Sequence, residues 1–299
     1  MEEQIRLAAF KWLKEQTTIH GDVLPRSLLE KGFEFNGQRI TLIGPQGIWK
    51  PKAFDKIPLS VTTIYNGPYE DSFNQDGFLV YRYRGTDPLH RDNIGLREAM
   101  KKQTPLIYFH SIVPGKYMAV WPVYIIQDNP VNLSFTLAAD EISSVENYLF
   151  SNLIADSTEN AKRNYITSTV KIRLHQKSFR ERVLQAYKEQ CAFCRLKHVE
   201  LLDAAHIISD GELMGDPIVT NGLSLCKIHH AAFDSNIVGI TPDYEIKVRE
   251  DILYETDGPM LKHGIQELQN QKIILPYSKN LWPDQERLEI RYKKFREAG

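Results

Sequence analysis

One short stretch of this chain, residues 191–236, holds all three of its cysteines and four of its nine histidines. Cys191 and Cys194 form a C-x-x-C pair, and Cys226 and His229 repeat the same gap as C-x-x-H. Two such turns that face each other provide the sulfur and nitrogen ligands that tetrahedral structural zinc prefers. Because the cysteine count is odd and the cysteines lie among histidines, a disulfide framework is disfavoured. We expect one structural Zn²⁺ on these four side chains, in a protein of the reducing cytoplasm.

Three further polar residues lie between and directly after these two turns: His206, Asn221 and His230. The order His, Asn, His, combined with two zinc-binding turns, resembles the sequence motif of the HNH, or ββα-metal, endonucleases. The resemblance is limited to residues 191–236. It implies a hairpin that carries the first histidine and a short helix that carries the last. We accordingly expect strands within residues 200–208 and 222–225, and a helix that begins at Lys227.

The resemblance also assigns chemical roles to the three residues. His206 occupies the position of the general base, because a neutral imidazole can take a proton from the attacking water near pH 7. Asn221 matches the residue that holds the loop of the base histidine. His230 matches a ligand of the catalytic divalent cation, expected to be Mg²⁺, which neutralises charge on the scissile phosphate and on the leaving oxygen.

One position departs from the pattern of the family. Many HNH endonucleases have Asp or His directly before the base histidine as a further metal ligand, whereas this chain has Ala205 there. We favour Asp234 as the second Mg²⁺ ligand, because it lies four residues after His230 and therefore on the same helix face. Asp203, three residues before His206, is the second candidate.

The neighbouring histidines His229 and His230 have to be divided between the two metals. We assign His229 to zinc because it repeats the two-residue gap of the first turn, which leaves His230 to face the hairpin. The reverse assignment, with His230 on the zinc in a C-x-x-x-H turn, stays open. A zinc cluster with a purely structural role is a further alternative.

Residues 49–127 have a different sequence pattern. Short runs rich in β-branched and aromatic residues alternate with turn residues, which indicates strands in residues 59–65, 78–83, 106–109 and 117–126. One helix is expected between them, over residues 93–102. This pattern predicts a compact β-barrel or sandwich.

Four motifs follow one another in this part of the chain: G-P-Y-E-D-S at 67–72, V-Y-R-Y-R-G at 80–85, N-I-G-L at 93–96 and P-L-I at 105–107. Together they resemble the SRA domain, a PUA-like barrel that reads modified cytosine, over residues 45–127. We therefore expect an α+β protein in which an SRA/PUA-like β-barrel domain precedes a small zinc-containing ββα-metal domain.

The SRA resemblance implies a pocket for a base that is flipped out of the duplex. In the family two tyrosines stack on that base and replace its lost stacking. The matching positions here are Tyr69 and Tyr81. Family members usually have an acid three residues after the first tyrosine, where this chain has Ser72, next to Asp71. The departure leaves the identity of the base open, and the alternative is that both tyrosines are ordinary core aromatics.

The segment between the SRA-like and the HNH-like regions is rich in basic residues in its second half. Residues 128–160 read as a loop followed by an acidic helix over residues 140–150. Residues 162–188 then contain eight Lys or Arg and one acid, with apolar residues at helical spacing. We expect the outward-facing basic residues of this helix to contact the DNA backbone: Lys177, Arg180 and Arg182. The alternative is an ordinary solvated helix face.

We predict four segments along the chain. Residues 1–139 form an N-terminal helix and the SRA-like reader, and residues 140–185 form a helical, basic connector. Residues 186–245 form the nuclease domain. Residues 246–299 form a tail with a possible edge strand at 273–275 and a helix that starts at Pro283 and Asp284.

The two resemblances together imply a modification-dependent (type IV) restriction endonuclease that recognises modified cytosine, such as 5-methylcytosine, in double-stranded DNA. Because a double-strand break needs two active sites, we expect a homodimer. The formal net charge of −1 places any DNA-binding surface in local clusters. No apolar run reaches about 18 residues, so no membrane span is expected. The alternatives are an HNH nuclease that reads unmodified or backbone-modified DNA, and a non-cutting reader of modified DNA with a structural zinc knuckle.

Overall fold

The computed structural model describes the chain except for residues 65–72, 75–77, 141–156, 257 and 299. It divides into two compact units, Met1–Lys177 and Ser178–Gly299, which are taken here in turn. The division falls inside one long helix, α5 (Ser157–Ala186), so each unit contains one end of that helix. None of the described helices combines the length and the apolar composition that a membrane-spanning segment needs.

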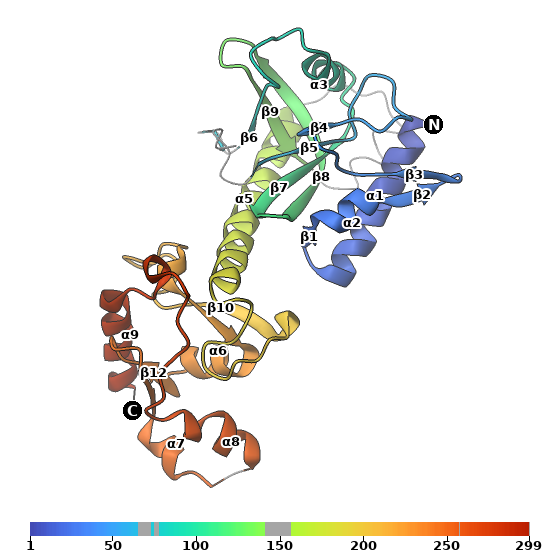
Figure 1. Cartoon of the computed structure of the whole chain (residues 1–299). Helices are drawn as coiled ribbons and strands as arrows, with labels where there is room; N and C mark the ends of the chain where they lie inside the picture. The colour runs from blue at the N-terminus through green and yellow to red at the C-terminus, as the bar shows by residue number, and fades with distance from the viewer. Residues whose placement is uncertain (65–72, 75–77, 141–156, 257, 299) are drawn as a thin grey trace. The chain divides into compact units, whose positions relative to one another are not determined.

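The first unit is built on a seven-stranded sheet with the strand order β4-β5-β7-β8-β9-β6, and β1 pairs with β8 outside this path. The strands are β1 (Val23–Pro25), β4 (Ile48–Trp49), β5 (Ser60–Thr62), β6 (Leu79–Arg82), β7 (Leu106–Val113), β8 (Lys116–Asn129) and β9 (Ser134–Ala139). Paired strands run antiparallel, except that β5 and β7 are parallel. The sheet curls into half of a barrel (Figure 1).

Both faces of this sheet are covered, because alternate residues of β7 belong to two different apolar clusters. Ile107 and Phe109 belong to an apolar cluster with α1 (Glu2–His20), α2 (Arg26–Lys31) and the hairpin of β2 (Phe33–Phe35) and β3 (Gln38–Ile40). Tyr108 belongs to a second cluster with α3 (Arg91–Lys101) and the middle of α5. Successive side chains of a strand point to opposite faces of a sheet. A strand that is covered on both sides is therefore mostly apolar, and β7 follows this pattern except at His110 and Ser111.

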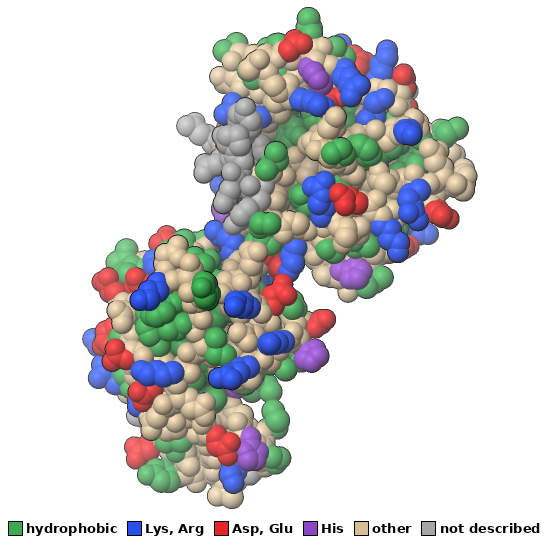
Figure 2. Space-filling model, viewed as in Figure 1, with side chains coloured by type: hydrophobic (Ala, Val, Ile, Leu, Met, Phe, Trp, Pro, Cys, Tyr) green, Lys and Arg blue, Asp and Glu red, His purple; other side chains and the backbone are tan. Residues whose placement is uncertain are grey.

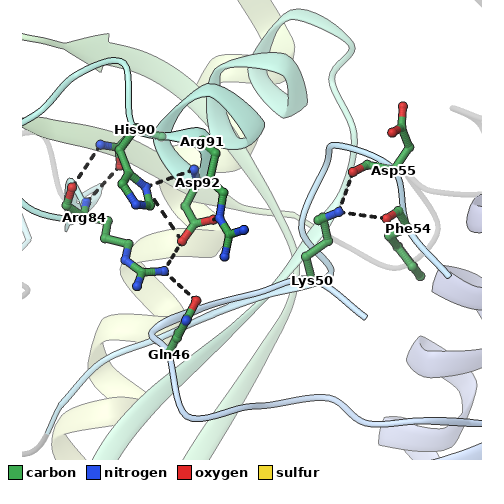
Figure 3. Close-up of polar contacts among 9 residues, drawn as sticks. Gln46, Lys50, Phe54, Asp55, Arg84, His90, Arg91 and Asp92 are labelled. Atoms are coloured by element: carbon green, nitrogen blue, oxygen red, sulfur yellow. Dashed lines mark hydrogen bonds and ion pairs between the residues drawn. The ribbon is translucent and has the colours of Figure 1, made fainter. Parts of the chain in front are cut away.

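Arg84 joins parts of the first unit that lie far apart in the sequence (Figure 3). Its guanidinium donates hydrogen bonds to Gln46, in the turn before β4, and to Asp92, in the first turn of α3. Its backbone is held by the buried Asn93, whose Oδ1 accepts from Arg84 N at 2.9 Å and whose Nδ2 donates to Arg84 O at 3.1 Å. These contacts fix the chain between β6 and α3.

The second unit begins with the end of α5 and then forms an antiparallel hairpin of β10 (Leu202–His206) and β11 (Gly222–Cys226), followed by α6 (Lys227–Asp234). A second hairpin, β12 (Val238–Ile240) and β13 (Ile246–Val248), comes next, and then the helices α7 (Glu250–Tyr254), α8 (Pro259–Gly264) and α9 (Gln285–Glu297). Asp284 caps α9, because its side chain accepts a hydrogen bond from Arg287 N at 2.9 Å.

The tail helix packs on the second hairpin. Phe295 of α9 lies against β12 at Gly239, where a Cβ atom would come within 2.5 Å of the phenyl ring. Glycine at this position therefore allows the helix to approach the strand closely. Leu288 of α9 belongs to the same apolar cluster as Leu202 and Leu225 of the first hairpin, so the tail is part of the core of this unit.

A glycine also sets the approach of α5 to the first hairpin. Gly222 begins β11 and pairs with His206 across the hairpin. A Cβ atom at this position would lie 2.4 Å from Val183 and 2.9 Å from Phe179, both on α5. Because carbon atoms do not approach so closely, a side chain here would force the side chains of Val183 and Phe179 to move. The absence of a side chain at position 222 therefore lets α5 lie directly on the hairpin.

The mixed α+β class is confirmed, and so are the main expected elements. The hairpin strands and the helix from Lys227 lie where the HNH resemblance places them, and α3 is the helix expected over residues 93–102. β9 was missed. The acidic helix expected over residues 140–150 lies outside the described residues apart from Asp140. The possible edge strand at 273–275 is not formed. The SRA-type barrel and the four domain boundaries stay predictions.

Candidate metal centre and nuclease site

Four side chains of the second unit form a cluster with the composition of a structural zinc site: Cys191, Cys194, Cys226 and His229. Their possible ligand atoms all lie within 4.8 Å of one another. Nδ1 of His229 is 3.4 Å from Sγ of Cys191 and 3.3 Å from Sγ of Cys226. Three thiols and one imidazole at this spacing match the Cys₃His sets that bind zinc tetrahedrally. The cluster contains His229 rather than His230, in agreement with the predicted division of the two histidines.

The far side of the His229 ring is held from outside the cluster. Nε2 of His229 donates a hydrogen bond to the backbone oxygen of Gly264, at the end of α8, over 2.7 Å. Metal-binding histidines commonly donate their second N–H to such a partner, which fixes the tautomer and the ring orientation. The bond therefore directs Nδ1 towards the thiols. The partner lies beyond residue 245, the predicted end of the nuclease domain.

His206, the predicted general base, ends β10 and stacks on an aromatic ring of α5. The ring centroids of His206 and Phe179 are 3.9 Å apart, and the planes differ by 14°. Nε2 of His206 is buried and has no hydrogen-bond partner among the described residues. Burial lowers the pKa of His206 from its ordinary value. Burial thus favours the neutral imidazole, one of whose nitrogens has no partner among the described residues.

Asn221, the predicted middle residue of the motif, is fully buried and ties down the loop that leaves His206. Its Oδ1 accepts a hydrogen bond from Ile208 N at 2.9 Å, and its Nδ2 donates to Ile208 O at 3.0 Å. Nδ2 also donates to Asp216 O at 3.0 Å, further along the same loop. A single buried amide thus fixes both ends of residues 208–216.

His230, on α6, lies between two carboxylates. Its Nδ1 is 3.7 Å from Oδ2 of Asp203, and its Nε2 is 3.3 Å from Oδ2 of Asp234. The carboxylate of Asp203 raises the pKa of His230, and His230 in turn holds the pKa of Asp203 at about 2. Both candidate ligands from the sequence therefore lie beside His230, one at each ring nitrogen.

A pocket of about 390 Å³ opens next to these residues. Its polar lining consists of His206, Ser209, Asp210, His230, Asp234, Arg291 and Lys294. The predicted base and the predicted metal ligands thus face one space, whereas Asp203 lies outside its lining. Four polar lining residues were missed from the sequence: Ser209, Asp210, Arg291 and Lys294. Asp210 stands four residues after His206, but nothing in the sequence connects the tail helix with the motif.

The basic residues predicted to contact DNA make contacts inside the protein. Arg180 donates to the backbone oxygens of Val199 at 3.1 Å and Leu202 at 2.9 Å, and Arg182 donates to Pro217 O at 3.0 Å. Within the first unit, Nζ of Lys177 lies 3.7 Å from a carboxylate oxygen of Asp22. On the visible face of each unit, basic and acidic side chains are interspersed (Figure 2). Phosphate contacts by these three residues stay a prediction.

The predicted base pocket falls largely outside the described residues, which do not include Tyr69, Asp71 and Ser72. Tyr81, on β6, is described. It is 7% exposed and belongs to the apolar cluster beneath the sheet. Its hydroxyl group lies 3.5 Å from the backbone oxygen of Thr62, to which it donates. Stacking of Tyr69 and Tyr81 on a base stays a prediction.

Comparison with known proteins supports the nuclease assignment. Residues 191–241 match the sequence model of a family described as HNH endonuclease. No curated protein matches the chain. Among solved structures, the "Modification dependent TagI restriction endonuclease" is similar, with 15% sequence identity over 80% of this chain and 82% of that chain. Its TM-score of 0.30 is too low to establish a shared fold. The family match covers His206, Asn221 and His230, and it confirms the prediction of an enzyme that hydrolyses DNA.

Proposed function

We propose that the chain is a modification-dependent restriction endonuclease, which reads a modified base with its first unit and cuts DNA at the pocket of its second unit. The observation that carries the nuclease part is the convergence of His206, His230 and Asp234 on one pocket. The reading part rests on the sequence motifs and on the contact that joins two of them, between Asn93 and Arg84. Since a double-strand break needs two such pockets, we propose that the protein acts as a homodimer.

In this proposal His206 is the general base. Its ring lines the pocket and its Nε2 has no partner among the described residues, and we propose that this nitrogen takes the proton of the attacking water. The flat contact with Phe179 restricts the ring, and the loop held by Asn221 fixes the backbone beyond it. Orientation of the base is thereby established before DNA binds, which is the arrangement that proximity effects require.

His230 and Asp234 are proposed as ligands of the catalytic cation, with Mg²⁺ as the favoured ion. The carboxylate of Asp234 is the kind of oxygen donor that Mg²⁺ prefers, and the imidazole of His230, one helical turn before it, adds a nitrogen donor. When bound, such a cation neutralises charge on the phosphate and on the leaving oxygen. Asp203 is then an orienting residue, since it lies at the opposite ring nitrogen and outside the pocket lining. The Cys₃His cluster is proposed to hold Zn²⁺ that stabilises the hairpin.

The assignment of the first unit to SRA-type base reading is supported by contacts between motifs. Asn93, from the N-I-G-L motif, bonds the backbone of Arg84, from the V-Y-R-Y-R-G motif, at 2.9 Å and 3.1 Å. Motifs that are separate in the sequence are therefore joined in space, in the part of the chain that would carry Tyr81. We propose Tyr69 and Tyr81 as the rings that hold the flipped base, and Asp71 and Ser72 as its polar edge.

The burial of Tyr81 favours a second candidate function. With 7% exposure and a hydroxyl directed at Thr62 O, Tyr81 has the contacts of a core residue. In that case the protein is an HNH nuclease whose first unit reads DNA by other means, without a flipped base.

Cleavage assays on matched plasmids separate these functions. The same plasmid is prepared unmodified, with 5-methylcytosine and with 5-hydroxymethylcytosine, and is incubated with the protein and Mg²⁺, with His206→Ala as the inactive control. Cleavage of modified plasmid only supports the first proposal, and equal cleavage of all plasmids supports the second. Tight binding of modified DNA without any cleavage would contradict the nuclease assignment.

A further inference from the structure

Part of the lining of the nuclease pocket comes from the tail helix α9. Arg291 and Lys294 of α9 line the same pocket as His206, His230 and Asp234. They lie outside residues 191–241, the segment that matches the HNH family. Their spacing of three residues places both on one face of the helix. The pocket therefore has two cations that the motif itself does not supply.

Arg291 is held in a fixed position by α6. Its Nη2 donates to Phe233 O at 2.5 Å, and its Nη1 donates to Oδ1 of Asn236. The guanidinium carbon lies 4.6 Å from the centroid of the Phe233 ring. A guanidinium has five N–H donors in a rigid fork, and these contacts with described residues take two of them. The other N–H donors of Arg291 can therefore bind a ligand in the pocket, and the guanidinium is already held in place there.

The surroundings of Arg291 strengthen its interaction with an anion. Burial lowers the pKa of Arg291, while Asp234 and Glu212 act in the opposite direction. An arginine nevertheless remains protonated in proteins. A charge that is partly removed from water interacts more strongly with a partner than an exposed charge does. Lys294 is more exposed, and its Nζ lies 2.6 Å from Oε2 of Glu212 in the loop after His206.

We infer that Arg291 binds a phosphate group of the DNA backbone in the nuclease pocket, and that Lys294 supplies a second positive charge at the same site. This inference rests on the proposed function, because it places DNA in that pocket. The anionic oxygens of the phosphate face the guanidinium on one side and the His230–Asp234 side of the pocket on the other. Arginine is suited to this task because its planar fork matches the oxygen spacing of a phosphate.

The alternative is that Arg291 only closes the end of α6. Both of its described hydrogen bonds go to groups at the C-terminal end of that helix, so a purely structural role predicts lost stability and nothing else. The salt dependence of DNA binding distinguishes the two roles. Each phosphate that a protein neutralises adds about 0.9 to the slope of log K against log salt concentration.

The test uses a fluorescein-labelled 30-base-pair duplex of the cleaved sequence, or random sequence if no cleavage is found, and the full chain with His206→Ala to prevent cutting. Binding is measured at several KCl concentrations with and without Arg291→Gln. We expect Arg291→Gln to reduce the slope by about one and the affinity roughly tenfold or more. The matched control is Arg296→Gln, which removes the same charge from α9 outside the pocket lining, next to Glu289. It should leave both quantities unchanged.

An unchanged slope in Arg291→Gln, with only a lower melting temperature, would overturn the inference. An equal loss in Arg296→Gln would also overturn it, because the effect would then belong to the charge of the helix as a whole. Should Arg291→Gln fail to fold, Lys294→Gln keeps the inference testable, since its side chain is 45% exposed. A normal slope in that variant counts against the site. If the wild-type protein cuts no DNA but the slope still falls, the proposed function fails while phosphate binding stands.

Discussion

The imidazole ring of His206 lies flat on the phenyl ring of Phe179, with the centroids 3.9 Å apart. Phe179 belongs to α5 and lies twelve residues before Cys191, the first cysteine of the Cys₃His cluster, and thus outside the HNH motif. The orientation of the proposed base is therefore set by a residue that the motif does not contain.

Replacing Phe179 should reduce cleavage without removing any reacting group. Phe179→Leu keeps the position apolar but loses the flat contact, so we expect the rate constant to fall roughly 10- to 100-fold, as for a misplaced catalytic group. Single-turnover cleavage measures this effect, with zinc content and melting temperature determined in parallel. An unchanged rate in a folded variant would show that the ring of His206 is oriented by other contacts.

His206→Ala should abolish cleavage while zinc content and DNA affinity stay near those of the wild type. Loss of a general base typically costs about 100- to 10,000-fold in rate. Because burial lowers the pKa of His206, the neutral form that acts as a base persists below the ordinary pKa of histidine. Wild-type cleavage should therefore hold at pH 6.5 and fall on further acidification. A rate that already falls at pH 7 and above would place the base elsewhere.

The two carboxylates beside His230 should respond differently to added Mg²⁺. Asp234→Asn removes a proposed metal ligand, so cleavage at low Mg²⁺ should be lost and partly restored when Mg²⁺ is raised. Asp203→Asn removes the partner at the other ring nitrogen, which lowers the pKa of His230 and leaves the ligand set intact. Its defect should not depend on the Mg²⁺ concentration. Rescue of Asp203→Asn but not of Asp234→Asn would exchange the two roles.

One equivalent of zinc per chain is expected on Cys191, Cys194, Cys226 and His229. Because closing such a site contributes directly to the free energy of folding, Cys226→Ser should lose zinc and lower the melting temperature markedly. Elemental analysis and thermal unfolding measure the two effects. The matched control is His198→Ala, in an exposed histidine of the same segment outside the cluster. A chelated protein that unfolds like the untreated one would rule out a structural role of the metal.

Tyr69→Ala and Tyr81→Ala test the reading of a flipped base. Stacking on an aromatic ring is worth about 1–3 kcal/mol per base, so loss of one ring should erase most of the preference for modified DNA. Affinity for unmodified DNA should change little, since phosphate contacts carry no base information. The measurement compares paired modified and unmodified duplexes. Equal loss for both duplexes would identify the tyrosines as core residues.

The sequence predicted those parts of the site that depend on short-range patterns. The Cys₃His cluster, the hairpin and α6 follow from spacings within residues 191–236, and Asp284 caps α9 as expected. β9 was missed because its six residues form a short buried run, which periodicity alone does not distinguish from other structures.

The residues that the sequence did not reveal are brought to the site by tertiary contacts. Phe179 reaches His206 from α5, and Gly264 bonds His229 across 35 positions. Arg291 bonds Phe233 across 58 positions. Local propensities and short motifs do not predict such contacts, because the contacts form only when elements far apart in the sequence pack together. Tyr69, Asp71 and Ser72 of the predicted base pocket lie outside the described residues.

The proposed nuclease site should be sensitive to substitution of Gly222, a residue that has no side chain to take part in the reaction. It does not line the pocket and is not part of the Cys₃His cluster, yet even the Cβ atom of alanine there would press on Val183 and on Phe179, the ring that supports His206. In a population of sequences under selection for DNA cleavage, this position would be as intolerant of substitution as the histidines themselves. Homologues that carry a larger residue at the start of this strand would have had to move the preceding helix, and would orient their base by a different contact.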